Sequence, residues 1–367
     1  MPDAIRQGPI APGGAPIGTT TTTTTTTVTA AHRTIASPRA DWLALHSEDI
    51  LDPAQPIVDA HHHLWALPGA TYLRPQLLED LDSGHDIRAT VFVDCHSHYL
   101  SSGPAALRPT GETAFVVAQA PADDATRGGL CAAIVGWADL MLGEQVSPVL
   151  EAHMQAGQGR FRGIRSRPTW HDDAEVHPSR EGSAGLLREP ALQRGARALG
   201  AMGLSLDLWI YHTQLDDVAH LAAHCPDTTL VLNHCGGPLG NGPFTHRRAE
   251  VFDDWRQRIR SLASHPQVHI KLGGLAMPRM GFGLELAQRP LDSSALAAAW
   301  APYFETCIEA FGTQRCMFES NFPVDKTGCS YAVLWNAFKR VAAGCSASER
   351  TDLFMRTATR TYGMAQR

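Results

Sequence analysis

Three consecutive histidines, His61, His62 and His63, stand two residues after the apolar run Pro56-Ile57-Val58. Side chains alternate between the two faces of an extended strand, so His61 and His63 should point the same way and His62 the other way. Two imidazoles that converge from one strand end suit a divalent metal or an anionic substrate. A chance cluster is the alternative, because the chain contains 18 histidines.

The elements that would position these residues follow a regular pattern from residue 56 onward, in which β-rich runs alternate with amphipathic helical stretches. The expected strands are residues 57–59, 89–94, 132–137, 161–165, 204–211, 229–233, 269–273 and 316–320. Helical patterns are found at residues 77–81, 146–154, 215–224, 252–262, 296–311 and 334–342. This alternation predicts a (β/α)8 TIM barrel. A doubly wound sheet would instead place a Gly-rich phosphate turn after its first strand, where this chain has histidines.

Active sites of (β/α)8 barrels are built from the carboxyl ends of the strands. In this chain, polar and ionisable residues recur where most of the expected strands end. Beyond the first strand they are Asp94, His96, His98, Arg165, Arg167, Tyr211, His212, Asn233, His234, Lys271, Glu319, Asn321 and Asp325. Random placement would put many such residues in helices or at the opposite face, so the pattern predicts an active site.

The overall composition excludes several classes of protein. The chain has 367 residues, 44% of them hydrophobic, which is enough for a large core. Its formal net charge is -6, with acidic and basic residues well mixed. No basic stripe indicates a nucleic-acid partner, and no apolar run approaches the roughly 20 residues of a membrane helix.

The first part of the chain differs in composition from the rest. Residues 1–40 are rich in Pro, Gly and Thr, with an unbroken threonine run from Thr19 to Thr27, and are expected to form a disordered tail. The barrel domain is expected at residues 41–367. The N-terminus has no apolar signal region, and none of the eight cysteines forms a C-x-x-C pair. We therefore expect free thiols and a cytoplasmic protein.

Several motifs carry a resemblance to a known family. The motifs are Asp59-Ala60-His61-His62-His63-Leu64-Trp65, Phe161-Arg162-Gly163-Ile164-Arg165, Leu232-Asn233-His234-Cys235-Gly236-Gly237-Pro238, Met317-Phe318-Glu319-Ser320-Asn321-Phe322-Pro323-Val324-Asp325 and Thr357-Ala358-Thr359-Arg360-Thr361-Tyr362-Gly363. Over about residues 56–363 the chain resembles the amidohydrolase superfamily, in particular its amidohydrolase-2 (amidohydrolase-related) family. That group includes sugar lactonases, 2-pyrone-4,6-dicarboxylate lactonase and sulfomuconolactone hydrolase, with certain decarboxylases as more distant members.

The resemblance implies roles for the histidines. His61 and His63 match the family's H-x-H, which ligates a metal or polarises the substrate carbonyl in metal-free members. His234 matches a histidine that lies over the reacting centre. His212 either corresponds to a fifth-strand ligand of the metal-binding branches or is an ordinary loop histidine. The implied metal is zinc, with manganese second, and a metal-independent enzyme is the alternative.

The eighth strand departs from the family pattern. Asn321 stands where the superfamily usually has an aspartate that binds metal and activates water. A neutral amide cannot accept a proton at pH 7. We expect Asp325 to supply the missing carboxylate; the alternatives are Glu319, which could also be an inward-facing charge paired with an arginine, or water activation by His234.

Other polar strand ends suit substrate binding. A guanidinium at Arg165 would bind a carboxylate or lactone carbonyl. Arg167 is expected either to do the same or to form a structural ion pair. His96, His98 and Tyr211 are expected to line the pocket, and the alternative for His96 and His98 is that they hold a metal.

The resulting hypothesis is hydrolysis of a lactone or other activated cyclic ester of a small, carboxylate-bearing molecule by activated water. Metal-dependent decarboxylation of an aromatic or unsaturated acid, hydrolysis of a cyclic amide or imide, and a binding barrel without catalysis are the alternatives. Specificity is assigned to loops at residues 101–111, 170–188 and 276–290. A homo-oligomer is compatible with the sequence.

Overall fold

The computed structural model describes residues 38–67, 70–120, 129–176 and 182–364. The chain divides into the units Met1–Thr34 and Ile35–Arg367, and the described residues belong to the second unit. Most of the predicted tail, residues 1–37, lies outside the described residues, so its predicted disorder stays a prediction. A short helix, α1 (Ala40–Leu43), begins at the end of that segment.

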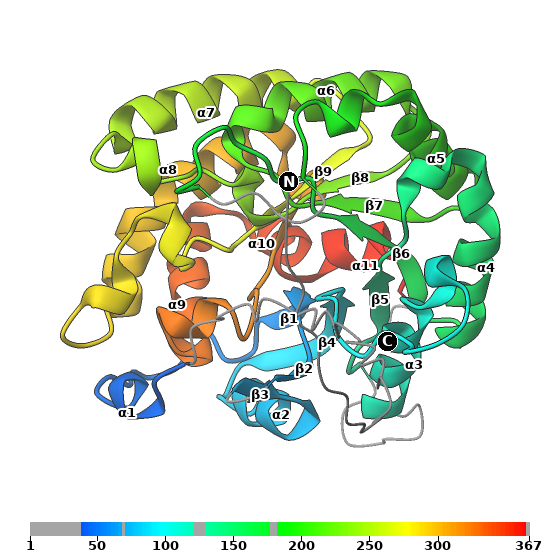
Figure 1. Cartoon of the computed structure of the whole chain (residues 1–367). Helices are drawn as coiled ribbons and strands as arrows, with labels where there is room; N and C mark the ends of the chain where they lie inside the picture. Colours follow the sequence, from blue (N-terminus) through cyan, green and yellow to red (C-terminus); the bar gives the residue numbers. More distant parts are fainter. Residues whose placement is uncertain (1–37, 68–69, 121–128, 177–181, 365–367) are drawn as a thin grey trace, which may run out of the picture. The chain divides into compact units, whose positions relative to one another are not determined.

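Eight parallel strands form one sheet that curves into a barrel (Figure 1). In sheet order they are β1 (Pro56–His62), β4 (Asp86–Val93), β5 (Ala133–Gly136), β6 (Phe161–Ser166), β7 (Ser205–Leu208), β8 (Leu230–Leu232), β9 (Val268–Leu272) and β10 (Cys316–Phe318). The last and first strands meet through a bridge between His62 and Phe322, and the Asn321 amide donates to the His61 carbonyl over 2.8 Å. The predicted TIM barrel is therefore confirmed.

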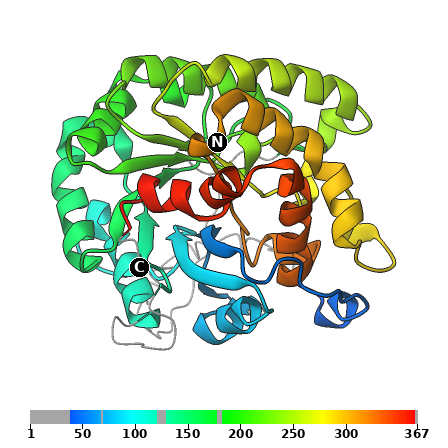
Figure 2. The same ribbon diagram turned by 180° about the vertical axis from the view of Figure 1, so that it is seen from behind.

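Helices surround the barrel, and the C-terminal helices cross one end of it (Figures 1 and 2). The helices are α2 (Arg74–Leu81), α3 (Thr110–Gln119), α4 (Ser147–Ala156), α5 (Pro190–Ala201), α6 (Leu215–His224), α7 (Arg248–Leu262), α8 (Ser293–Phe311), α9 (Tyr331–Val341), α10 (Ala347–Thr351) and α11 (Thr357–Thr361). A small hairpin of β2 (Trp65–Leu67) and β3 (Ala70–Tyr72) follows β1. None of the described helices has the length and apolar character needed to cross a membrane.

Among the described helices of ten or more residues, α3 and α5 were not predicted from the sequence. In α5 the pattern is interrupted by Gly195 and Gly200, residues with low helix propensity. Both glycines allow close packing, because a Cβ at Gly195 would lie 2.4 Å from the Leu140 carbonyl oxygen and one at Gly200 2.5 Å from Thr228 Oγ1. Helix packing against its neighbours thus outweighs the weak local preference.

The inside of the barrel changes character along its axis. Toward the amino ends of the strands it is apolar, with Val58, Ala133 and Val231 packed against Tyr362, the residue that follows α11. Toward the carboxyl ends, alternate residues of the strands bring charged side chains together. These are Arg165 of β6, Asp207 of β7, Lys271 of β9 and Glu319 after β10, none more than 3% exposed.

His153 of α4 joins two helices to the end of a strand. One ring nitrogen lies 2.8 Å from the Thr113 hydroxyl of α3, and the other donates to the Trp137 carbonyl after β5 over 2.9 Å. Burial lowers the pKa of His153 from 6.5 to about 4. The folded protein therefore holds this side chain neutral.

Acidification should destabilise the fold through His153. As pH falls below 6.5 the unfolded chain binds a proton that the folded chain excludes until about pH 4. His153→Gln should therefore reduce the loss of unfolding free energy between pH 6.5 and 4 by about 3 kcal/mol. Urea unfolding at several pH values measures this, with the exposed His224→Gln as control. An unchanged pH dependence in His153→Gln would contradict the assignment.

Candidate active site

The histidines at the end of β1 alternate as predicted. Nε2 of His61 lies 3.3 Å from Nε2 of His63, whereas His62 turns the other way and contacts the Thr90 hydroxyl at 3.0 Å. His63 donates from Nδ1 to the Val93 carbonyl over 2.7 Å, which leaves its Nε2 as an acceptor facing His61. Both side chains are buried, with His61 fully inaccessible to solvent.

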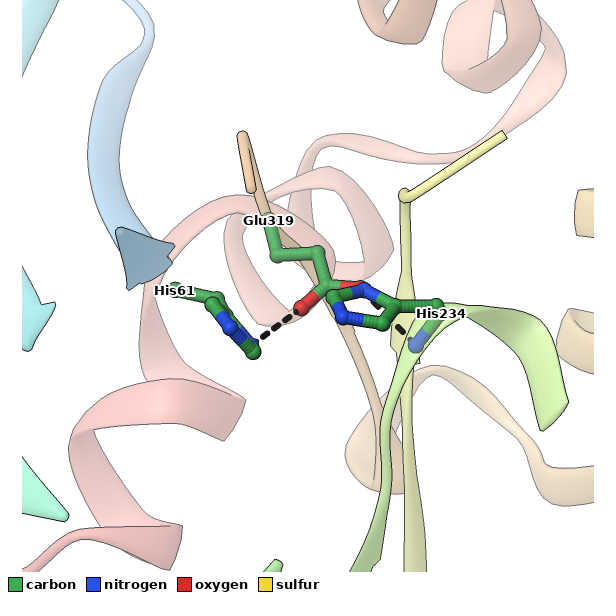
Figure 3. A group of neighbouring side chains, drawn as sticks. All are labelled: His61, His234 and Glu319. Atoms are coloured by element: carbon green, nitrogen blue, oxygen red, sulfur yellow. Dashed lines mark hydrogen bonds and ion pairs between the residues drawn. The ribbon is translucent and has the colours of Figure 1, made fainter. Parts of the chain in front are cut away.

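Glu319 contacts one histidine of β1 and one histidine that follows β8 (Figure 3). Its Oε2 lies 2.9 Å from Nδ1 of His61, and its Oε1 lies 2.7 Å from Nδ1 of His234. The backbone amide of His234 also donates to Oε1 over 2.9 Å. The carboxylate therefore holds two histidines from strands that are not neighbours in the sheet.

Two consecutive glycines after β9 make room for this arrangement. A Cβ at Gly273 would lie 2.5 Å from Glu319 Cγ, and one at Gly274 would lie 2.5 Å from His234 Cβ. Gly274 also has a φ of +71°, which disfavours any side chain there. His234 has a positive φ of its own, 54°, so its placement strains the backbone.

Burial shapes the protonation of the cluster. It lowers the pKa values of both His61 and His234 well below 6.5, and nearby cations, chiefly Lys271 for His61 and Arg165 for His234, lower them further. Burial raises the pKa of Glu319 to about 8, against the opposing effect of Lys271. The imidazoles are thus neutral at pH 7 and can accept a proton or a metal.

Lys271 lies beneath the cluster and is fully buried. Its Nζ pairs with Asp207 Oδ2 at 2.8 Å and lies 3.4 Å from His61 Nδ1. Asp207 in turn accepts hydrogen bonds from the Tyr362 hydroxyl, at 2.9 Å, and from Asn233 Nδ2, at 3.0 Å. The Lys271–Asp207 ion pair thus lies next to His61 and is hydrogen-bonded to Tyr362 in the C-terminal segment.

Arg165 approaches the histidines from β6. Its Nη1 lies 3.4 Å from His61 Nε2, and its Nη2 donates to the Asp94 carbonyl oxygen. Its Nε is buried and has no hydrogen-bond partner among the described residues. The guanidinium is therefore positioned beside the histidines with one donor unused, which agrees with the predicted substrate contact but does not test it.

The loop after β10 holds Asn321 and Asp325 together. Asn321 Nδ2 donates to Asp325 Oδ1 over 2.7 Å, and the Ala276 amide contacts Asp325 Oδ2 at 3.3 Å. Burial raises the pKa of Asp325 well above its usual value. The carboxylate that contacts the histidines is therefore Glu319, one of the alternatives in the sequence analysis, while a role for Asp325 as base stays a prediction.

The remaining predicted site residues lie around this cluster. His212 accepts the Leu239 amide on Nδ1 at 3.3 Å and burial lowers its pKa to about 4. The Tyr211 hydroxyl donates to the Val176 carbonyl at 3.3 Å and accepts from Arg279 at 2.8 Å, so three loops meet there.

The second histidine pair is less buried than the first. His96 Nε2 lies 3.5 Å from Asp94 Oδ2, and His98 stacks on Phe115 with ring centroids 3.6 Å apart. Arg167 is buried, and its charge acts together with that of Arg165 on the Asp94 carboxylate.

A metal would find its ligands in part of this cluster. Among the described residues, one group of three or more has potential ligand atoms all within 4.8 Å of one another: His61, His234 and Glu319. Two imidazole nitrogens and one carboxylate are a donor set that zinc accepts. His63 and His212, the other two predicted ligands, are not in this group, and their ligation stays a prediction.

Comparison with known proteins now identifies the family. A sequence profile described as "Amidohydrolase" (Amidohydro_2) matches residues 58–364. The chain belongs to the amidohydrolase-2 family. The resemblance seen in the sequence motifs is thereby confirmed.

This amidohydrolase has relatives of similar length. It is 34% identical to the uncharacterised protein y4mH of Sinorhizobium fredii, over 83% of this chain and 98% of that protein. It is 29% identical to an L-fucono-1,5-lactonase of Burkholderia multivorans, over 84% of this chain and 96% of the relative. A crystal structure of a Burkholderia multivorans amidohydrolase with bound zinc matches with a TM-score of 0.64 and 26% identity, over 84% of this chain and 99% of that one.

Sequence reasoning missed Asp207 and Tyr362 of this amidohydrolase. Asp207 stands between Leu206 and Leu208, which both pack outward in the main core, so strand alternation directs it into the barrel. That alternation was a usable signal. Tyr362 was recognised only as part of the motif at residues 357–363, and its partner could not be inferred because it is 155 residues away in the chain.

Zinc binding tests the grouping of His61, His234 and Glu319. Glu319→Gln should weaken zinc binding by at least tenfold, because it removes the only anionic ligand of the group. His212→Gln should bind zinc as the unaltered protein does. Competition with a fluorescent chelator measures both affinities. The reverse ranking would favour the ligand set implied by the family resemblance.

Proposed function

We propose that this amidohydrolase opens a lactone or similarly activated cyclic ester of a small, carboxylate-bearing molecule. The observation that carries the proposal is the hydrogen-bonded pair of His234 and Glu319, placed beside His61, His63 and Arg165 at the carboxyl end of the barrel. The lactonases among its relatives support the reaction class. The proposal assigns a role to each of these side chains.

His234 acts as the general base. Its Nδ1 is engaged by Glu319 at 2.7 Å, so Nε2 is the nitrogen that takes the proton from water. Burial lowers its pKa, which keeps the imidazole neutral and ready to accept. In its ionised form, which predominates above its pKa of about 8, Glu319 accepts from Nδ1–H, fixes this tautomer and stabilises the imidazolium that forms, as an acid residue does in a catalytic triad.

Arg165 and the β1 histidines act on the carbonyl. Arg165 and His61 present N–H donors from two strands, and negative charge builds up on the carbonyl oxygen as water attacks. Since a guanidinium binds carboxylates through two parallel hydrogen bonds, Arg165 and Arg167 also favour an anionic substrate. His96, His98 and Tyr211 are proposed to line the pocket, and Asp325 to hold Asn321 in place.

A bound metal, zinc first and manganese second, would be held by His61, His234 and Glu319 and would supply a Lewis acid for the carbonyl. Measuring the metal content of active protein decides whether His234 acts as a metal ligand or as the general base. In metal-free active protein the histidines and Arg165 polarise the carbonyl themselves.

Lactone hydrolysis releases one acid group per turnover, so a pH indicator can follow it. L-fucono-1,5-lactone and a panel of carboxylated lactones are suitable substrates. His234→Ala should lower kcat/KM by about 10² to 10⁴, the usual contribution of a general base. The exposed His224→Ala is the control. Full activity of folded His234→Ala would refute the base assignment.

Arg165→Met should act mainly on binding of the anionic group. We expect KM for carboxylated lactones to rise at least tenfold, with a smaller change for neutral lactones, because a charged hydrogen bond is lost. Steady-state kinetics on matched neutral and carboxylated substrates measures this difference. Equal effects on both substrates would contradict the anionic-substrate proposal, and release of CO2 without lactone hydrolysis would favour the decarboxylase alternative.

A further inference from the structure

Lys271 is a fully buried ammonium that the proposed reaction does not use. It stands on β9 inside the barrel, and its Nζ lies 3.4 Å from His61 Nδ1. The same nitrogen of His61 lies 2.9 Å from Glu319 Oε2. One side of the candidate metal group is therefore already faced by an ammonium that is paired with Asp207.

Lys271 is held in this place from several sides. Asp207 Oδ2 pairs with its Nζ at 2.8 Å, and the Tyr362 ring lies 5.2 Å from the ammonium. Asp207 itself is fixed by the Tyr362 hydroxyl and by Asn233. Every one of these partners is buried, so the ammonium is enclosed on the sides that they form.

A divalent ion in this group would share the negative charge of Glu319 with Lys271, although Lys271 is also paired with Asp207. Glu319 is the only anionic member of the group formed with His61 and His234. An ammonium beside it neutralises part of its charge and repels any further cation, and this repulsion is strong because the site is dry. A divalent ion must therefore bind against the field of Lys271.

We propose that Lys271 is the resident countercation of the group formed by His61, His234 and Glu319, and that it lowers the affinity of this group for divalent metal ions. This inference rests on the metal group named in the proposed function. It makes Lys271 a determinant of whether the enzyme carries metal at a given metal concentration. Asp207 and Tyr362 are positioning residues that keep the ammonium in place.

Zinc affinity of the full-length protein tests this proposal directly. Lys271→Met should bind zinc at least tenfold more tightly than the unaltered protein in competition with a fluorescent chelator. Lys271→Arg, which keeps the charge, should stay near the unaltered value. Lys339→Met is the matched control, because Lys339 is also buried but bonds to the Leu51 and Asp52 carbonyls and to His85.

A double variant avoids leaving an unpaired charge in the barrel. Lys271→Met alone leaves the Asp207 charge buried without its partner, which is costly and could itself attract zinc. Lys271→Met with Asp207→Asn removes the ion pair as a unit and keeps the net charge. Tighter zinc binding by this folded double variant supports the proposal, and equal or weaker binding overturns it. Absence of lactone hydrolysis by the unaltered protein would refute the proposed function while leaving the zinc comparison valid.

Discussion

The burial of one carboxylate, that of Glu319, is the constraint on which the arrangement of the site depends. An ionised carboxylate away from water is costly unless donors surround it. Here the His234 amide and ring donate to Oε1, whereas His61 Nδ1 lies 2.9 Å from Oε2, and burial still raises the pKa of the carboxyl to about 8. Gly273 and Gly274 exist where larger residues would displace Glu319 or His234. The Glu319 carboxylate thus constrains which residues can occupy positions 273 and 274 and where His61 and His234 lie.

The barrel interior accommodates further charges by pairing them across one intervening strand. Lys271 of β9 pairs with Asp207 of β7, and Arg165 of β6 lies beside the Asp94 carboxylate after β4. Below this layer the interior is apolar. The division separates the part of the barrel suited to chemistry from the part that holds the fold together, as is usual in (β/α)8 proteins.

Much of this could be predicted from the sequence because strands and their ends leave local signals. The eight strand regions and the opposed directions of His61 and His62 follow from periodicity alone. The choice between Glu319 and Asp325 could not be made, since both follow β10 and their partners come from distant strands. Helix α5 was missed because its glycines serve packing contacts that only the folded structure creates.

The hydrogen bond from Tyr362 to Asp207 has a consequence for how the protein is made. Tyr362 lies beyond the last helix of the described chain, yet its hydroxyl completes the surroundings of an ion pair in the centre of the barrel. A nascent chain still held in the ribosome at that point has its strands but lacks this contact. The Tyr362–Asp207 hydrogen bond can therefore form only after residue 362 has emerged from the ribosome, behind all eight strands.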